Sequence, residues 1–347
     1  MKGHQACARK FTLLATLWTL VSLLAVGGGW GLFNHYRHSP LSGVETPRII
    51  EIVPGEGFSA ITQKLQAQGI IQSQWPFMAL AALQGRTTRI RAGEYRLSPG
   101  ITPQGLLDQL VKGEILLHRL TLVEGWTFRQ VRGAVAGHPE IRQTLTDLTD
   151  EGVMEALGAP GLSPEGRFFP DTYLFPRGTS DLKLLQQAHY RLQAELEAAW
   201  AARQPDLPFK SPVELLTLAS LVEKETALAS ERPQIAGVFV RRLRLGMPLQ
   251  TDPTVIFGLG ADFDGNIRRR DLQMEHPYNT YRIAGLPPGP IALVGRAALA
   301  AAAHPAPGDT LYFVSRGDGS HVFSSTLEAH NRAVNCYQRK QCLGVTP

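Results

Sequence analysis

Two glutamates in the stretch LASLVEKETALASERPQ, residues 218–234, are the side chains best suited to acid–base chemistry. The stretch has the apolar spacing of a buried helix, yet it carries Glu223 and Glu225. An ionised carboxylate among apolar groups is costly unless it is paired, or unless its pKa rises and it stays protonated. A carboxylic acid that is protonated at neutral pH is the group that a glycosidic leaving oxygen requires. An acid of this stretch that stays protonated could therefore transfer a proton to such an oxygen.

The helix that carries these acids has a defined start. Ser211 at the N-cap, Pro212 at the first helical position and Glu214 at the third form a capping box. At about 100° per residue, one arc of about 120° holds the apolar side chains of Leu215, Leu218, Leu221 and Val222. Glu225 falls inside this arc, and Glu223 lies about 160° away. The two acids are therefore not a pair, because residues two apart do not share a helix face.

Helix phase leaves two interpretations of Glu225. In the first, the carboxylate pairs with an arginine of the same core, for example one from VRRLRLGM, residues 240–247. In the second, Glu225 is the catalytic acid, and Glu223 is an orienting or structural group behind it. Phase alone favours the ion pair, and the sequence downstream shifts the balance towards catalysis.

Three downstream segments predict structured loops that could line a sugar cleft. They are LQTDPTVIFGLG (249–260), HPYNTYRIAGLPPGPI (276–291) and HVFSSTLEAHN (321–331), all rich in proline, glycine and neutral polar residues. The candidate substrate-binding residues are Gln250, Asp252, Tyr278, Asn279 and Tyr281. Each also has a competing structural interpretation as turn chemistry, as in Asp252-Pro253. Together with one buried acid, they point towards a glycan.

Composition limits the class of protein. The chain has 347 residues, a net charge of +5 and 44% apolar residues, which suits a folded protein of two domains with length left for an anchor. The basic charge fits an anionic neighbour such as a membrane or cell wall, but no basic block with interleaved aromatics indicates nucleic-acid binding. No Cys/His cluster has metal-ligand spacing, so we predict no metal and no cofactor. Cys336 and Cys342 leave a disulfide open.

The N-terminus predicts a membrane anchor. Residues 11–33 carry no charge and are long enough to span a bilayer. Basic residues precede this run, so residues 1–10 are expected in the cytoplasm and the rest outside, as in a single-pass protein of the inner membrane. Residues 34–47 read as a linker. A cleaved signal peptide is the alternative, but the run exceeds a typical signal core and no A-x-A site follows it.

A strand, glycine turn and amphipathic helix recur after the linker. The three copies are 50–69, 94–113 and 120–137, and the apolar pairs on their helices are Ile61/Leu65, Leu106/Leu110 and Val131/Val135. We expect the copies to pack together as a small αβ domain over residues 48–137, followed by a catalytic domain of mixed α and β structure over 138–347. The fold class is α+β. The small domain either holds polysaccharide or is a spacer.

The chain resembles the endolytic murein transglycosylase family, which is membrane-anchored and has a LysM-like N-terminal domain. The resemblance rests on EGRFFPDTY, LASLVEKETALASER, RRLRLGMPLQTDPTVIFGLG, YNTYRIAGLPPGPI and HVFSSTLEAHN, in that order. One departure is ALVG after GLPPGPI, where the family has a short turn that ends in Pro-Gly.

The resemblance implies cleavage of the β-1,4 bond between N-acetylmuramic acid and N-acetylglucosamine, leaving 1,6-anhydro-muramyl ends. It assigns catalysis to the second glutamate of the E-K-E-T motif, which is Glu225 here. It also implies that the protein ends the growth of nascent strands beside peptidoglycan synthases. Two alternatives stay open from the residues. One is a hydrolytic muramidase with Asp252 as partner, and the other is a wall-binding scaffold without turnover.

Overall fold

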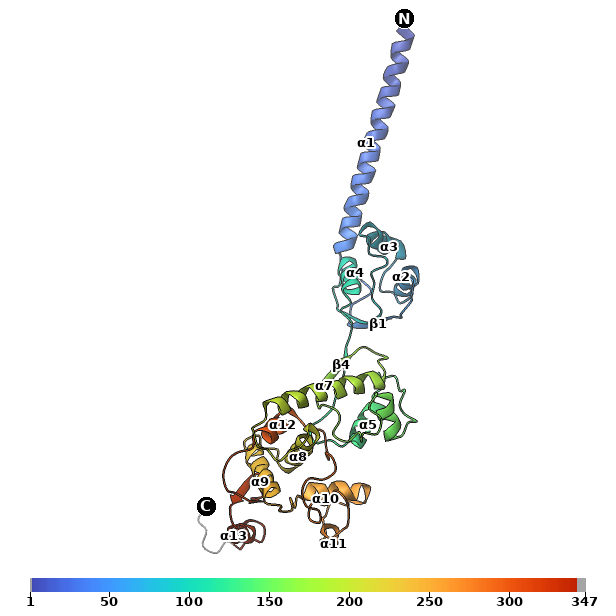
Figure 1. Ribbon diagram of the computed structural model, residues 1–347. Helices are drawn as coiled ribbons and strands as arrows, with labels where there is room; N and C mark the ends of the chain where they lie inside the picture. Colours follow the sequence, from blue (N-terminus) through green and yellow to red (C-terminus); the bar gives the residue numbers. More distant parts are fainter. Residues whose placement is uncertain (1, 342–347) are drawn as a thin grey trace. The chain divides into compact units, whose positions relative to one another are not determined.

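The computed structural model describes residues 2–341, with side chains from residue 16 onwards (Figure 1). The chain divides into two compact units after His118. Helices and three separate two-stranded sheets make up the described residues. The mixed helix-and-strand fold predicted from the sequence is therefore confirmed.

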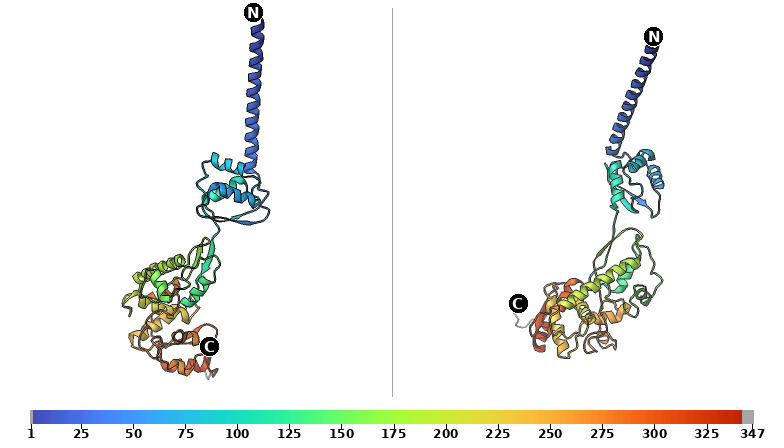
Figure 2. Two further views of the ribbon diagram at one scale, coloured as in Figure 1. Left: turned by 90° about the vertical axis from the view of Figure 1, so that its right-hand side faces the viewer. Right: turned by 45° about the horizontal axis from the view of Figure 1, so that its top comes forward.

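Helix α1 (Lys2–His38) is continuous and extends beyond the charge-free run of residues 11–33 (Figure 2). Its segment Thr16–His38 is long and apolar enough to cross a membrane, and apolar side chains such as Trp18 and Leu32 are exposed. The predicted linker of residues 34–47 is only partly a linker. Its first residues are helical, and Leu41 and Val44 are buried in the first unit because their apolar side chains complete its core.

The first unit places three helices against one antiparallel pair of strands. Its elements are β1 (Arg48–Ile52), α2 (Phe58–Ala67), α3 (Gln74–Leu83), β2 (Gly93–Leu97) and α4 (Pro103–Lys112). The strands are antiparallel, with Arg48 opposite Leu97 and Ile52 opposite Gly93. Alternate strand residues point inward, as the period of two requires. They meet the predicted helical pairs, and the buried set includes Ile50, Ile61, Leu65, Tyr95, Leu106 and Leu110.

The third strand–turn–helix copy belongs to the second unit, so the structure places the domain boundary earlier than residue 137. The elements of this region are β3 (His118–Thr121), α5 (Phe128–Ala136), α6 (Asp150–Ala156), β4 (Thr172–Phe175) and α7 (Asp181–Ala202). Strand β3 pairs with β4 and not with β1 or β2 of the first unit. Val131 and Val135 of α5 join a core with α6 and α7. The local pattern predicted the strand and the helix of this copy correctly, but it could not identify which partner would cover the apolar face of the helix.

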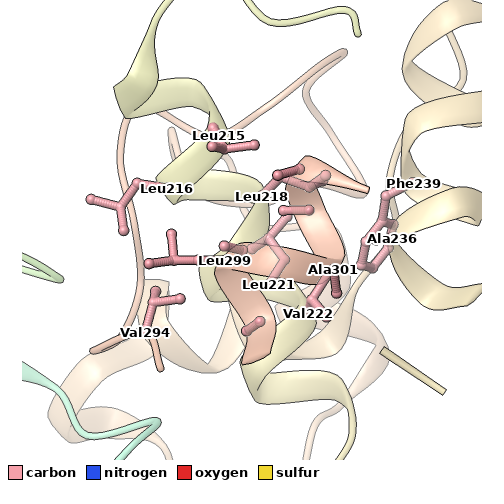
Figure 3. Close-up of a cluster of buried hydrophobic side chains, with 14 of the residues drawn as sticks. Leu215, Leu216, Leu218, Leu221, Val222, Ala236, Phe239, Val294, Leu299 and Ala301 are labelled. Atoms are coloured by element: carbon pink, nitrogen blue, oxygen red, sulfur yellow. The ribbon is translucent and has the colours of Figure 1, made fainter. Parts of the chain in front are cut away.

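Helix α8 (Pro212–Glu225) lies at the centre of the second unit's larger core. It begins as predicted, because Ser211 Oγ accepts a hydrogen bond from the Glu214 amide. Helices α9 (Arg232–Arg244) and α12 (Arg296–Ala303) pack against it (Figure 3). Every α8 residue from Leu215 to Val222 is buried. The helix is therefore held rigidly up to its last turn.

The remaining elements surround the end of α8. They are α10 (Asp252–Leu259), the 3₁₀ turn η1 (Gly260–Asp262), α11 (Arg269–Leu272), β5 (Tyr312–Ser315), β6 (His321–Ser324) and α13 (Leu327–Tyr337). Strands β5 and β6 form an antiparallel hairpin. The predicted loop at 249–260 is largely the helix α10, which starts at the Asp252-Pro253 step. Cys336 in α13 is disulfide-bonded, and Cys342 lies outside the described residues.

Candidate active site

The end of α8 meets the start of α10 at Glu225. Glu225 is the last residue of α8, and Thr251 is the N-cap of α10. The Thr251 hydroxyl donates a hydrogen bond to Glu225 Oε1. Thr251 is only 1% exposed, so this donor is fixed in position. A carboxyl group is thereby held at the junction of two helices.

Position along α8, and not helix phase, sets the surroundings of Glu225. All residues from Leu215 to Val222 are buried, so the predicted apolar arc and the opposite face of this helix do not differ in burial. Glu225 is partly buried and faces a cleft with a volume of about 370 Å³. Its polar lining includes Glu225, Arg242, Gln250, Asp252, Tyr281 and His321.

The ion-pair interpretation of Glu225 is not what the structure shows. Among the described residues, Glu225 makes no ion pair. Arg242, from the 240–247 segment, lines the same cleft but donates to the main-chain carbonyls of Leu311 at 2.7 Å and Leu249 at 2.9 Å. Its guanidinium also lies 5.1 Å from the ring centroid of Tyr312. The arginine therefore braces the walls of the cleft and leaves the Glu225 carboxyl unneutralised.

Burial raises the pKa of Glu225 to about 7. The negative charge of Asp252 adds to the increase, whereas the hydrogen bond from Thr251 and the positive potential of His321 oppose it. Loss of hydration disfavours the ionised carboxylate, and no counter-ion compensates fully. Near neutral pH the protonated and ionised forms of Glu225 are therefore both well populated.

His321 is a cleft residue that sequence reasoning missed. Its Nδ1 lies 2.7 Å from Glu231 Oε2, and its main-chain amide donates to Glu231 Oε1 at 2.9 Å. These contacts fix the imidazole ring, with Nε2 as its remaining nitrogen. The only sign of His321 in the sequence is its place in the predicted loop segment HVFSSTLEAHN. The contact between His321 and Glu231 joins residues ninety positions apart, so it leaves no local sequence pattern. Thr251 lies in the predicted loop segment 249–260, but its hydrogen bond to Glu225 could not be predicted from the sequence.

Three of the predicted substrate-binding residues line the Glu225 cleft. They are Gln250, Asp252 and Tyr281. The Tyr281 hydroxyl donates to Asp252 Oδ1 at 2.6 Å, and burial raises the pKa of Tyr281. Gln250 has a φ of 52°, a left-handed conformation that is rare for glutamine. Such backbone strain is typical of functional loops that the surrounding structure holds in place.

Asn279 and Tyr278, the other two predicted residues, do not line this cleft. Asn279 is fully buried, and its Nδ2 donates to the carbonyls of Leu272 at 3.1 Å and Met274 at 2.7 Å. Its side-chain amide, which both donates and accepts, is used to satisfy loop backbone. The ring of Tyr278 packs on Phe257 with centroids 4.7 Å apart. Both residues therefore shape the loop that carries Tyr281.

Glu223 has the arginine partner that Glu225 lacks. Its Oε1 accepts from Arg232 Nη2 at 3.0 Å, and its Oε2 accepts from the Gly295 amide at 2.9 Å. The side chain is 3% exposed. Burial raises its pKa, although Arg232 and the Gly295 amide act in the opposite direction. This acid ties α8 to the start of α9 and to the residue before α12.

Among the residues that the structure describes, no group of three or more His, Cys, Asp or Glu side chains could hold a metal ion.

The sequence profile of the YceG-like family matches residues 50–336, which include both acids and every residue that lines the cleft except Gln338. The chain belongs to the YceG-like family. This confirms the resemblance drawn from the five sequence motifs.

Two curated relatives of this YceG-like chain carry the same name. A Bacillus subtilis (strain 168) protein named endolytic murein transglycosylase is 32% identical over 335 residues, 90% of this chain and 91% of that protein. A Streptococcus pneumoniae (strain D39) protein of that name is 27% identical over 90% of this chain. The match covers 63% of the length of the S. pneumoniae protein. The crystal structure of a putative YceG-like protein from Listeria monocytogenes matches 83% of this chain and 99% of its own, with 28% identity and a TM-score of 0.53.

The raised pKa of Glu225 predicts a pH-dependent effect of the substitution Glu225→Gln on stability. From about pH 4.5 to 7 the folded protein keeps the Glu225 proton while the unfolded chain loses it, so wild-type stability falls as the pH rises. Glutamine does not ionise, so the variant does not undergo this loss of stability as the pH rises. The variant should therefore gain up to about 3 kcal/mol over the wild type at pH 8, with no gain at pH 4.5.

Urea unfolding of the full chain in detergent at both pH values measures this difference. The exposed Glu197 provides the matched control, Glu197→Gln, which should show no such dependence. A stability difference for Glu225→Gln that is equal at pH 4.5 and pH 8 would contradict the assigned pKa.

Proposed function

We propose that this YceG-like chain is an endolytic murein transglycosylase, a lyase, and that Glu225 is its only acid–base catalyst. One observation carries the proposal: the Glu225 carboxyl lies in a cleft, has no ion-pair partner among the described residues, is oriented by Thr251, and has a pKa of about 7. The names of the relatives from B. subtilis and S. pneumoniae support the reaction.

In the first step, protonated Glu225 acts as a general acid. Thr251 occupies Oε1, which leaves Oε2 to carry the proton. The bond between muramyl C1 and the glycosidic oxygen breaks, and that oxygen takes the proton from Glu225. Ordinary glycosidases use a second carboxylate to deliver water or to attack C1 directly. Here the substrate's own hydroxyl replaces that group.

In the second step, the same carboxylate acts as a general base. It removes the proton from the muramyl C6 hydroxyl while O6 forms a bond with C1. The 1,6-anhydro ring closes, no water is consumed, and Glu225 returns to its protonated form. A pKa near neutrality suits a group that must give and then accept a proton.

The oxocarbenium-like charge at C1 needs electrostatic stabilisation. Asp252 and Gln250 both line the Glu225 cleft and are proposed for this role. Asn279, the other sequence candidate, is committed to loop carbonyls. Asp252 also keeps the muramidase alternative testable, because an acid in this position could activate water in place of the C6 hydroxyl.

Digestion of purified peptidoglycan by the full chain, followed by mass spectrometry, tests this mechanism. We expect muramyl ends that are lighter by one water than reducing ends. Glu225→Gln should lower turnover at least about a hundredfold, as expected for loss of general acid–base catalysis. Glu223→Gln should reduce stability but leave the product type unchanged.

Other outcomes would identify the alternatives. Reducing ends in place of anhydro ends would indicate a hydrolase with Asp252 as partner. Binding without any product from the wild type would indicate a scaffold. Loss of turnover in Glu223→Gln but not in Glu225→Gln would reverse the assignment of the two acids.

We further propose that α1 anchors the enzyme in the inner membrane with its N-terminus in the cytoplasm. The exposed apolar side chains of Thr16–His38 support the anchor. The basic residues before the apolar run support its orientation. The catalytic unit would then lie outside the cytoplasm, where membrane-bound synthases extend nascent strands, and cleavage there would end strand growth.

Protease treatment of spheroplasts checks the orientation. A protease added outside should degrade the chain after α1 and leave a tag at the N-terminus intact. Release of the whole protein by salt or alkali, or protection of the catalytic unit, would contradict the proposed anchor.

The first unit is proposed to act as a LysM-like domain that holds glycan. Its support is the repeated strand–turn–helix pattern, whose first two copies form one antiparallel pair of strands covered by α2 and α4, with α3 in the same core. A full chain with Glu225→Gln should co-sediment with peptidoglycan, and deletion of residues 48–117 should reduce this retention severalfold. Equal retention of both forms would leave the first unit with the role of a spacer.

A further inference from the structure

A second cleft lies beside the end of α8. Its volume is about 390 Å³, and its lining includes Phe128, Glu165, Lys224, Pro253 and Ile256. Lys224 and Pro253 are the chain neighbours of Glu225 and Asp252, which line the first cleft. The end of α8 and the start of α10 therefore form a wall that both clefts share. A ligand that extends beyond one cleft can reach the other.

Two cations with unused donors border the second cleft. Arg129 is exposed, and within residues 16–341 its side chain makes no hydrogen bond or ion pair. Lys224 is exposed and donates one hydrogen bond, to the Gly125 carbonyl at 3.2 Å. An ammonium group has three donors, so two remain available. Asp150 also lines this cleft, but it is paired with Arg132 at 2.8 Å and does not neutralise the two free cations.

The floor of the second cleft is apolar and carries one carboxyl group. Phe128, Ile256 and Phe257 provide the apolar surface. Both oxygens of Glu165 accept from the Phe128 amide at 3.1 Å, which places the carboxyl at the start of α5. Burial raises the pKa of Glu165 to about 7. The cleft thus combines cationic donors at its rim with small apolar surfaces inside.

We propose that the second cleft binds the stem peptide attached to the muramyl residue of the strand held beside Glu225. This inference rests on the proposed function. The sugar rings of the strand are uncharged, and the lactyl carboxyl group is an uncharged amide while the stem peptide is attached, so the sugars give Arg129 and Lys224 no ionic partner. The peptide on the lactyl group carries carboxylates and small apolar side chains, and this chemistry complements both the rim and the floor.

Binding of the peptide would position the scissile bond. A muramyl residue held through its peptide in the second cleft presents C1 to the first cleft across the shared wall. Binding energy from this non-reacting part of the substrate would then increase kcat/KM by orienting the sugar at Glu225. Strands without peptides would lack this contribution.

The test compares uncross-linked glycan strands with the same strands after an amidase has removed their stem peptides. The full chain in detergent is measured as wild type, Arg129→Ala and the double variant Arg129→Ala/Lys224→Gln. The double variant should lose about tenfold in kcat/KM on peptide-bearing strands, as expected for a lost charge-assisted contact. It should lose much less on peptide-free strands, whose only anionic group is the lactyl carboxylate that the amidase exposes. Arg269→Ala is the matched control, because Arg269 is exposed and lines neither cleft.

Two kinetic results would overturn the inference. Equal losses on both substrates would indicate that the cleft binds sugar or that the variants disturb Glu225, and no loss on either would show that the cleft is not used. If the wild type forms no product, binding can still be measured. The variants are then made in the Glu225→Gln background, and the strands that co-sediment with the protein are measured. If the double variant retains fewer peptide-bearing strands, the peptide site is supported even if the proposed reaction fails. If retention is unchanged, the peptide site is rejected.

Discussion

The hydrogen bond from Thr251 to Glu225 joins the last residue of α8 to the first turn of α10, and the arrangement of the cleft depends on it. A single side-chain contact can hold a carboxyl group only if both helices are themselves immobile. The complete burial of α8 from Leu215 to Val222 provides this rigidity on one side. On the other, Thr254 and Thr280 share a hydrogen bond of 2.8 Å beneath the start of α10. The precision of the site therefore comes from packing behind it.

Glu223 and Glu225 show how environment divides two like residues on one helix. Glu223 is enclosed, with an arginine and a main-chain amide on its two oxygens, and removing either partner would strand a buried charge. Glu225 has one hydroxyl donor, a neighbouring carboxylate and open space. The first arrangement fixes three elements together. The second leaves a proton that can be exchanged with a substrate. Two residues of separation along a helix are enough to produce both.

Local patterns in the sequence predicted the elements well, because a cap or an apolar pair acts within one or two turns. The Ser211-Pro212 start of α8, the pair Ile61/Leu65 and the three strand–turn–helix copies all appear in the structure. Long-range pairing could not be predicted in this way. Nothing near His321 reveals Glu231, and the α5 pattern does not identify α6 and α7 as its cover. Asn279 has a side chain equally suited to sugar and to loop carbonyls, and only the fold distinguishes them.

The location of Glu225 at the very end of α8 has an electrostatic consequence. The last turn of a helix carries a partial negative charge and opposes ionisation of a carboxyl group there, whereas the first turn carries a partial positive charge and favours it. Glu225 lies between the negative end of α8 and the positive end of α10. The two macrodipoles act in opposite senses on the same carboxyl group, so their effects on its pKa oppose each other. The backbone around Glu225 therefore leaves burial as the main cause of the raised pKa, and a pKa near neutrality serves a catalyst that must alternate between acid and base within one turnover.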